Sequence, residues 1–144
     1  WPNDILVGGR KIAGILCELT PANFVVGGIG MNLFHAEHQL PHDEATSLAL
    51  EGVHVDNVHK FTQELVETLM EVWTFAERVD ANWSGFLAPS VGTIGQMVKV
   101  AETRGHSWEG VAEGLDDDGR LLVRSSQDGL LRAVAAADVL HLRQ

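Results

Sequence analysis

Hydrophobic positions in the first 33 residues fall into three short runs that predict strands. Between the runs at 5–7 and 12–19 lie two adjacent glycines, Gly8 and Gly9, a pair typical of a two-residue hairpin turn. A third run, at 24–33, contains three glycines. Because glycine weakens a strand, several of them indicate close approach by a ligand or another backbone. We therefore expect three neighbouring strands that form one sheet.

Further along, the apolar spacing changes to three and four residues. This spacing predicts a long amphipathic helix over 58–76, which Asp56 can cap. A shorter helix is expected over 45–50, ended by Gly52 as a C-terminal cap. Between the sheet and these helices, the polar residues 34–44 are expected to form a mobile loop.

The last third of the chain has a different pattern, with short apolar segments between turn signals. Residues 84–92, with two glycines and a proline, are expected to be a linker. Two Asp-Gly pairs beyond it are typical hairpin turns. Short strand-like segments lie between such turn signals, at 97–101, 108–114, 121–124 and 130–134. This pattern predicts a small β-barrel, so we place a domain boundary between 1–89 and 90–144.

Composition narrows the function classes. The 144 residues are 45% hydrophobic and 21% charged, as in soluble globular domains. The chain has no apolar run near the roughly 18 residues that span a bilayer and no signal-peptide pattern, so we expect no membrane segment. The net charge of −10 argues against general nucleic-acid binding. Because it opens inside an apparent motif without methionine, we expect a piece of a longer protein.

Cysteine and histidine residues could indicate a reactive thiol or a metal site, but we favour structural interpretations for both. Cys17 is the single cysteine, so no intrachain disulfide can form, which suits a cytoplasmic protein. We interpret it as a buried small hydrophobic residue. His35, His38 and His42 could suggest zinc, but no cysteine accompanies them, and we interpret them as part of a polar loop.

Lys11 is the residue with the most chemical interest. It stands in an apolar strand context, and burying an ammonium group without a partner is costly. It must therefore reach solvent beside the turn or meet an anion, and the local pattern leaves both open. Asn3 and Asp4 follow a proline, as is common in turns. The glycines of the third strand are not a phosphate-binding loop of the Walker type.

The order of four motifs along the chain favours a functional interpretation of Lys11, Asp4 and Asn3. The sequence has Trp-Pro-Asn-Asp at 1–4, Gly-Arg-Lys-Ile-Ala-Gly-Ile-Leu at 9–16, Val-Val-Gly-Gly-Ile-Gly-Met-Asn at 25–32 and Ala-Thr-Ser-Leu at 45–48. In this order and spacing they resemble the biotin–protein ligase family. The resemblance is strong over residues 1–50 and weaker through the rest of the chain.

The resemblance implies a fold and an activity. The fold is α+β, a mixed sheet with helices related to class II aminoacyl-tRNA synthetases, followed by an SH3-like β-barrel. The activity uses ATP and Mg²⁺ to convert biotin into biotinyl-5′-AMP. It then transfers biotin to a lysine of the biotin carboxyl carrier protein of acetyl-CoA carboxylase, in the cytoplasm. Exposed sheet edges are compatible with a homodimer.

The resemblance also implies roles for individual residues. Lys11 matches the lysine that contacts the biotin carboxylate and the adenylate phosphate. Asp4 matches an active-site aspartate linked to Mg²⁺, while Asn3 and Asn32 match positions near the nucleotide. The loop 34–46 matches the segment that orders over the adenylate. Four further positions match the lining of the biotin pocket: Gly14, Leu16, Gly28 and Gly30.

Alternatives from other classes stay open. The family's Arg- and Gly-rich biotin loop is not found in these 144 residues, so we expect this chain alone to hold part of the site. One alternative is therefore a non-catalytic binding or assembly fragment. Another is a lipoate–protein ligase, which shares the catalytic fold, although Trp-Pro-Asn-Asp favours biotin.

Overall fold

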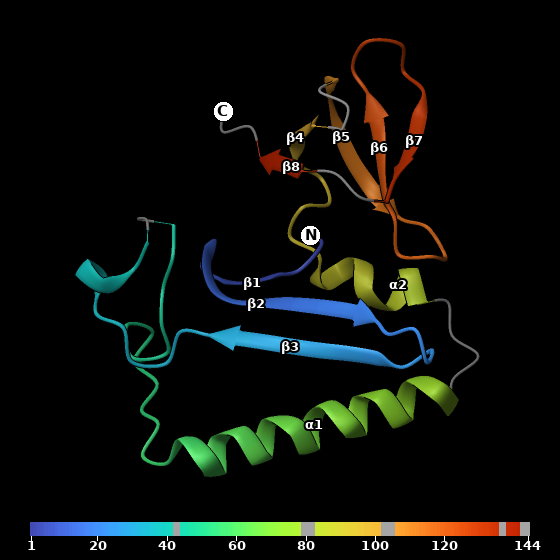
Figure 1. The fold of residues 1–144 in the computed structure, drawn as a ribbon. Coiled ribbons are helices and arrows are strands. Elements are labelled where there is room, and N and C mark those ends of the chain that lie inside the picture. Colours follow the sequence, from blue (N-terminus) through green and yellow to red (C-terminus); the bar gives the residue numbers. More distant parts are fainter. Residues whose placement is uncertain (42–43, 79–82, 102–105, 136–137, 142–144) are drawn as a thin grey trace. The chain divides into compact units, whose positions relative to one another are not determined.

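The computed structural model of the chain describes residues 1–41, 44–78, 83–101, 106–135 and 138–141 (Figure 1). The chain divides into two compact units. One comprises Pro2–Thr74, and the other comprises Trp1 together with Phe75–Gln144. The domain boundary near residue 90 remains a prediction.

The N-terminal unit is built on the expected three-stranded sheet. Its strands are β1 (Asp4–Val7), β2 (Arg10–Leu19) and β3 (Val25–Met31), paired antiparallel in that order. The turn between β1 and β2 has φ of 56° at Gly8 and 79° at Gly9. A type I′ turn requires positive φ at both central positions, which glycine adopts at little steric cost. The predicted hairpin and third strand are confirmed.

The ladder between β1 and β2 contains one irregularity that matters for the site. Asp4 lies opposite Gly14, whereas two residues later Leu6 lies opposite Lys11, so β2 carries one extra residue between these pairs. Because side chains alternate between faces, Lys11 and Asp4 would point to opposite faces in an uninterrupted ladder. The bulge places both on the same face.

The segment 45–50 is not a helix, so that expectation is wrong. Ala45 instead forms a parallel bridge with Lys11, and the Thr46 N–H donates to the Lys11 carbonyl at 2.8 Å. Backbone groups that a helix would use internally are thus engaged beside β2. This isolated parallel bridge lies outside the named strands, whose pairings are antiparallel.

A single turn follows, and Gly52 ends it as expected. The N–H of Gly52 donates to the Ala49 carbonyl at 3.2 Å, and that of Val53 donates to the Leu48 carbonyl at 2.8 Å. Gly52 has φ of 78°. These two bonds around a left-handed glycine form a Schellman motif.

The long helix is confirmed as α1 (Val58–Arg78). Its cap differs from the expectation: Asn57 Oδ1 accepts the N–H of Lys60 at 3.0 Å, and Asp56 instead lies 3.1 Å from His54. The capping side chain belongs to the residue immediately before the first helical residue, and α1 begins one position later than the Asp56 cap required.

The C-terminal unit contains a short helix and a five-stranded antiparallel sheet. The expected linker at 84–92 is wrong, because α2 (Trp83–Leu87) and the 3₁₀ turn η2 (Ala88–Ser90) lie there. A second 3₁₀ turn, η1 (Glu37–Gln39), lies in the polar loop of the N-terminal unit. The strands are β4 (Met97–Ala101), β5 (Ser107–Leu115), β6 (Leu121–Ser125), β7 (Leu131–Val134) and β8 (Asp138–His141), in the order β7-β6-β5-β4-β8. Four of these were expected, and β8 was not.

Alternating apolar residues of this sheet form its core. The buried cluster is Val98, Val100, Trp108, Ala112, Leu121, Val123 and Val134. Trp1 packs against this cluster, and its indole Nε1–H donates to the Gly119 carbonyl at 3.1 Å. The first residue of the Trp-Pro-Asn-Asp motif is therefore part of the C-terminal unit.

The distal half of the three-stranded sheet is exposed. Cys17 is exposed, so its interpretation as a buried residue is wrong. Leu16, Leu19 and Val25 are also more than half exposed. An apolar run in the sequence predicts a strand, but it does not establish that another layer covers that strand.

Candidate functional site

The centre of the candidate site is an ion pair between neighbouring strands. Lys11 Nζ of β2 lies 2.6 Å from Asp4 Oδ1 of β1, and the two side chains are 40% and 39% exposed. A pair this accessible contributes little to folding stability. Both charges can therefore be reached from solvent, and Lys11 has met an anion as well as staying accessible.

Gly14 lies beside this ion pair. A Cβ atom added at Gly14 would be 3.5 Å from Cε and Nζ of Lys11 and 3.9 Å from Oδ1 of Asp4. These are ordinary contact distances, so the lysine side chain lies directly over the glycine. A larger side chain would occupy the space that Lys11 uses.

The predicted pocket residues form two cross-strand pairs. Gly14 lies opposite Gly30, and Leu16 lies opposite Gly28. Since positions two apart share a face, all four belong to the face that carries Lys11. A Cβ added at Gly30 would meet no atom within 4 Å, and Leu16 is 75% exposed. This face is thus an open strip of backbone beside a cation.

Asn32 fixes the chain where β3 ends. Its N–H donates to the Ile12 carbonyl at 2.9 Å, and its side-chain Nδ2 donates to the Thr46 carbonyl at 3.0 Å. Its own carbonyl accepts the N–H of Leu48 at 2.9 Å. Asn32 therefore has a structural function, and its expected contact with nucleotide stays a prediction.

Asn3 is exposed and continues the hairpin by one residue. Its carbonyl accepts the N–H of Ile15 at 2.8 Å. This bond fixes the chain just before Asp4, and the expected contact of Asn3 with nucleotide stays a prediction.

Sequence reasoning missed a second ion pair beside Lys11. Arg10 Nη2 lies 2.7 Å from Oε1 of Glu51, and the same oxygen accepts the Thr46 hydroxyl at 2.5 Å. Thr46 and its neighbour Ser47 are fully buried. Both belong to the Ala-Thr-Ser-Leu motif, so the sequence pattern had already marked these two residues. Glu51 gave no signal, because its contact with Arg10 spans 41 positions of the chain.

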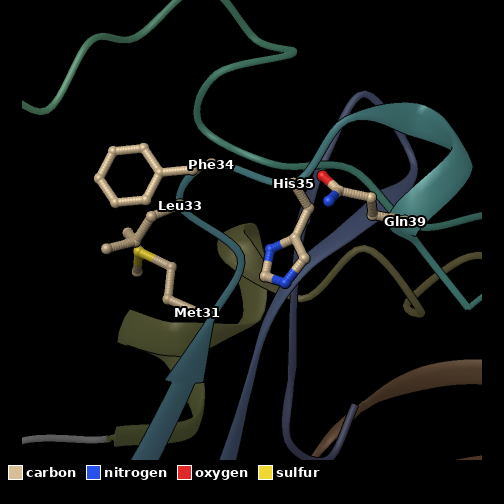
Figure 2. Close-up of a pocket in the computed structure, with 5 residues that line it drawn as sticks. All are labelled: Met31, Leu33, Phe34, His35 and Gln39. Atoms are coloured by element: carbon tan, nitrogen blue, oxygen red, sulfur yellow. The ribbon is translucent and has the colours of Figure 1, made fainter.

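A cavity of about 440 Å³ opens where β3 ends, lined by Met31, Leu33, Phe34, His35 and Gln39. Figure 2 shows the apolar side chains of Met31, Leu33 and Phe34 together, with His35 and Gln39 across from them. An apolar wall facing a few polar groups suits a flat heteroaromatic ring.

The described residues hold no cluster that would bind a metal by itself. Among them, no group of three His, Cys, Asp or Glu side chains is arranged to hold a metal ion. His42, one of the three loop histidines, lies outside the described residues. Asp4 is a single carboxylate, which suits Mg²⁺ only where substrate phosphates and water complete the shell.

Two family models match the chain at its two ends. The Biotin/lipoate A/B protein ligase family matches residues 1–32, and the Biotin protein ligase C terminal domain matches residues 93–142. The Biotin--[acetyl-CoA-carboxylase] ligase of Mycobacterium tuberculosis is 37% identical over 99% of the chain. The chain belongs to the biotin protein ligase family. The family resemblance of the four motifs is confirmed.

Other relatives agree with this membership. The Bifunctional ligase/repressor BirA of Bacillus spizizenii is 30% identical over 96% of the chain. The chain covers 52% of the mycobacterial ligase and 44% of this BirA, so it spans about half the length of the relatives it matches. No described helix of this family member combines the length and apolar character needed to cross a membrane.

Solved structures confirm the α+β fold. The apo biotin protein ligase from Aquifex aeolicus superposes on the whole chain with a TM-score of 0.75 at 23% identity, and 64% of that chain is covered. The same enzyme in complex with biotin and ATP gives a TM-score of 0.73 at 23% identity, with 61% covered. The small C-terminal sheet thus corresponds to the SH3-like domain of the family.

Proposed function

We propose that this chain is part of an ATP-dependent biotin–protein ligase and that its Lys11 face carries half of the reaction centre. The observation behind the proposal is that Asp4, Lys11 and the open strip of Gly14, Gly28 and Gly30 share one face of the sheet. A cation beside an uncovered backbone surface suits a flat ligand that ends in a carboxylate.

In the proposed first step, a biotin carboxylate oxygen attacks the α-phosphorus of ATP. A C–O–P mixed anhydride forms as the bond to pyrophosphate breaks. Two anionic groups must approach each other, and negative charge grows on the phosphoryl oxygens. The Lys11 ammonium group, held by Asp4, would stabilise this charge without needing to reorganise.

In the proposed second step, the ε-amine of a carrier lysine attacks the biotinyl carbonyl carbon. An amide bond forms, AMP leaves, and the amine loses a proton. Lys11 would again stabilise the leaving phosphate. The proposed acceptor is the biotin carboxyl carrier protein of acetyl-CoA carboxylase. The name of the mycobacterial relative contains this carboxylase.

Asp4 has two proposed roles at this centre. Its Oδ1 orients Lys11, and its carboxylate is the group through which the site could hold Mg²⁺ together with ATP phosphates. Bound there, Mg²⁺ would neutralise phosphate charge. A single carboxylate fits a metal ion that arrives with its nucleotide rather than one bound permanently.

The biotin ring is proposed to lie on the strip formed by the two cross-strand pairs. Gly14, Gly28 and Gly30 leave room for the bicycle, and the exposed Leu16 side chain supplies an apolar contact. Burying an exposed leucine against an apolar ring is favourable by the hydrophobic effect.

The nucleoside is proposed to occupy the cavity at the end of β3. Asn32, at the mouth of loop 34–46, and Asn3 are the proposed polar contacts to the nucleotide, while the cavity walls receive the base. Closure of this loop would exclude water and protect the mixed anhydride from hydrolysis.

The proposed setting is the cytoplasm, because the single cysteine allows no intrachain disulfide, which suits a reducing compartment. A homodimer that pairs sheet edges remains a prediction, since β1 and β3 are both edge strands of the three-stranded sheet.

ATP–pyrophosphate exchange by the full-length protein tests the proposal. We expect exchange that depends on biotin and is not supported by lipoate, and that is lost in Lys11→Ala. Exchange supported by lipoate alone would identify a lipoate ligase. Absence of exchange with either acid, in a folded full-length protein that still binds biotin, would identify a non-catalytic binding protein.

A further inference from the structure

The loop 34–46 is closed at its base by a network that we call the loop neck, formed by Asn32, Leu33 and His35 with residues 46–49. The Ser47 hydroxyl donates to the His35 carbonyl at 2.7 Å, and the Ala49 N–H donates to the Leu33 carbonyl at 3.0 Å. Asn32 bonds to the Thr46 carbonyl. Because Thr46 and Ser47 are fully buried, opening the neck would expose several polar groups that must find new partners.

The loop neck is joined directly to the backbone of Lys11. The Lys11 N–H donates to the Glu44 carbonyl at 2.7 Å, and the Lys11 carbonyl accepts the Thr46 N–H at 2.8 Å. Both peptide groups of the central cation are thus held by the end of the loop. A shift of the neck would move the strand position from which Lys11 projects.

Glu51 connects the same two elements through its side chain. Its Oε1 atom accepts one bond from Arg10, the residue before Lys11, and one from the hydroxyl of Thr46 in the neck. The Glu51 side chain is only 21% exposed, whereas Arg10 is 45% exposed. Hydrogen bonds that involve a charged group are stronger than neutral ones.

We propose that Glu51 is a positioning residue that holds the loop neck against β2 and so sets the place of Lys11. It touches neither reacting group; it acts through Arg10 and Thr46. The coupling itself is a property of this structure, and only its consequence for catalysis rests on the proposed function.

The kinetic consequence is specific. Without the Glu51 bonds, the ordered neck becomes one of several conformations, and ligands must select it. The apparent affinity is then the intrinsic affinity multiplied by the fraction of molecules in the binding-competent conformation. Saturating ligands restore the ordered state. For Glu51→Ala we expect KM for ATP and biotin in pyrophosphate exchange to rise about tenfold, with kcat changed less than about twofold. A fraction of irreversibly unfolded enzyme would instead lower the apparent kcat at constant KM.

Hydrogen exchange tests the coupling without any activity. In the full-length protein, the amides of Lys11 and Thr46 should exchange about tenfold faster in Glu51→Ala, while those of Val98 and Val100 in the C-terminal sheet stay unchanged. Glu51→Gln, which keeps an acceptor oxygen, should restore part of the protection. The matched control is Glu64→Gln, which removes an exposed glutamate paired with Lys60 on α1.

Unchanged exchange at Lys11 and Thr46 in Glu51→Ala would overturn the proposal. If that variant unfolds as a whole, Thr46→Val, which replaces the hydroxyl with a methyl group of similar size, decides. Faster exchange at Lys11 supports the coupling, and wild-type exchange overturns it. If the wild type catalyses no exchange of pyrophosphate, the proposed function fails, but the amide result still judges the coupling.

Discussion

Lys11 Nζ lies 2.6 Å from Asp4 Oδ1 because β2 contains one extra residue between the positions that pair with Asp4 and Leu6. Bulges of this kind change the face on which a side chain lies and are frequent beside active sites. The bulge therefore converts a hairpin lysine into a cation oriented by a carboxylate.

The role of this pair can be separated from stability with Asp4→Asn. The variant keeps the shape of the side chain and removes its charge, so Lys11 loses its orienting partner. We expect kcat of biotin-dependent pyrophosphate exchange to fall about 100-fold. The unfolding free energy should change by less than about 1 kcal/mol, since the pair is exposed.

Exchange kinetics and thermal denaturation of the full-length protein measure both effects. Asp56→Asn is the matched control, because Asp56 is also an exposed, paired aspartate but lies outside the site. A loss of exchange accompanied by an equal loss of folded protein would argue against the orienting role.

Gly14 should tolerate one added carbon and not three. A Cβ here meets Lys11 at ordinary contact distance, so Gly14→Ala should fold with nearly wild-type stability. The branched side chain of Gly14→Val must displace Lys11 from its position. We expect KM for biotin to rise about tenfold or more in Gly14→Val, well above any change in Gly14→Ala.

Gly27→Ala adds a methyl group at ordinary contact distance from Cys17, on the other face of the paired strand. It therefore measures the effect of a methyl group on folding away from the proposed biotin strip. Equal KM values for Gly14→Ala and Gly14→Val would show that Lys11 does not need the space over Gly14.

Gly110 in β5 is required for a close backbone approach. A Cβ there would lie 2.3 Å from the Arg124 carbonyl oxygen and 2.8 Å from Cγ1 of Val123. Since backbone of β6 would have to shift, Gly110→Ala should destabilise the C-terminal unit by about 1–3 kcal/mol. Gly114→Ala, on the same strand with nothing within 4 Å, is the control. Chemical denaturation of both variants should show a large loss only for Gly110→Ala.

The lowered pKa of Asp128 predicts that the stability of the fold decreases in acid. Hydrogen bonds from Arg132, and next the Leu130 N–H, lower the pKa of Asp128 below its ordinary value of 3.8. A depressed carboxyl pKa stabilises the fold above the unfolded value, and this contribution is lost as pH falls through the folded value. The melting temperature of the wild type should therefore drop more between pH 6 and pH 3 than that of Asp128→Asn. Identical pH profiles would exclude this contribution.

The sequence by itself determined the elements whose signals are local. Two adjacent glycines specify the turn between β1 and β2, because a type I′ turn, whose twist matches that of the strands, requires positive φ at both positions. The three- and four-residue spacing specifies α1, and the order of four short motifs identifies the family. Neighbouring residues carry these signals, so they can be read along the chain.

Only the tertiary structure decided which residues meet. Segment 45–50 follows helical spacing, yet backbone bonds to Lys11 turn its first part into an extended segment. Cys17 lies in an apolar run, yet no burial follows, because burial depends on a second layer. The bulge that brings Lys11 to Asp4, and Glu51 that joins Arg10 to Thr46, arise from pairing between distant positions. Such contacts are chosen by register and packing, which local propensity does not encode.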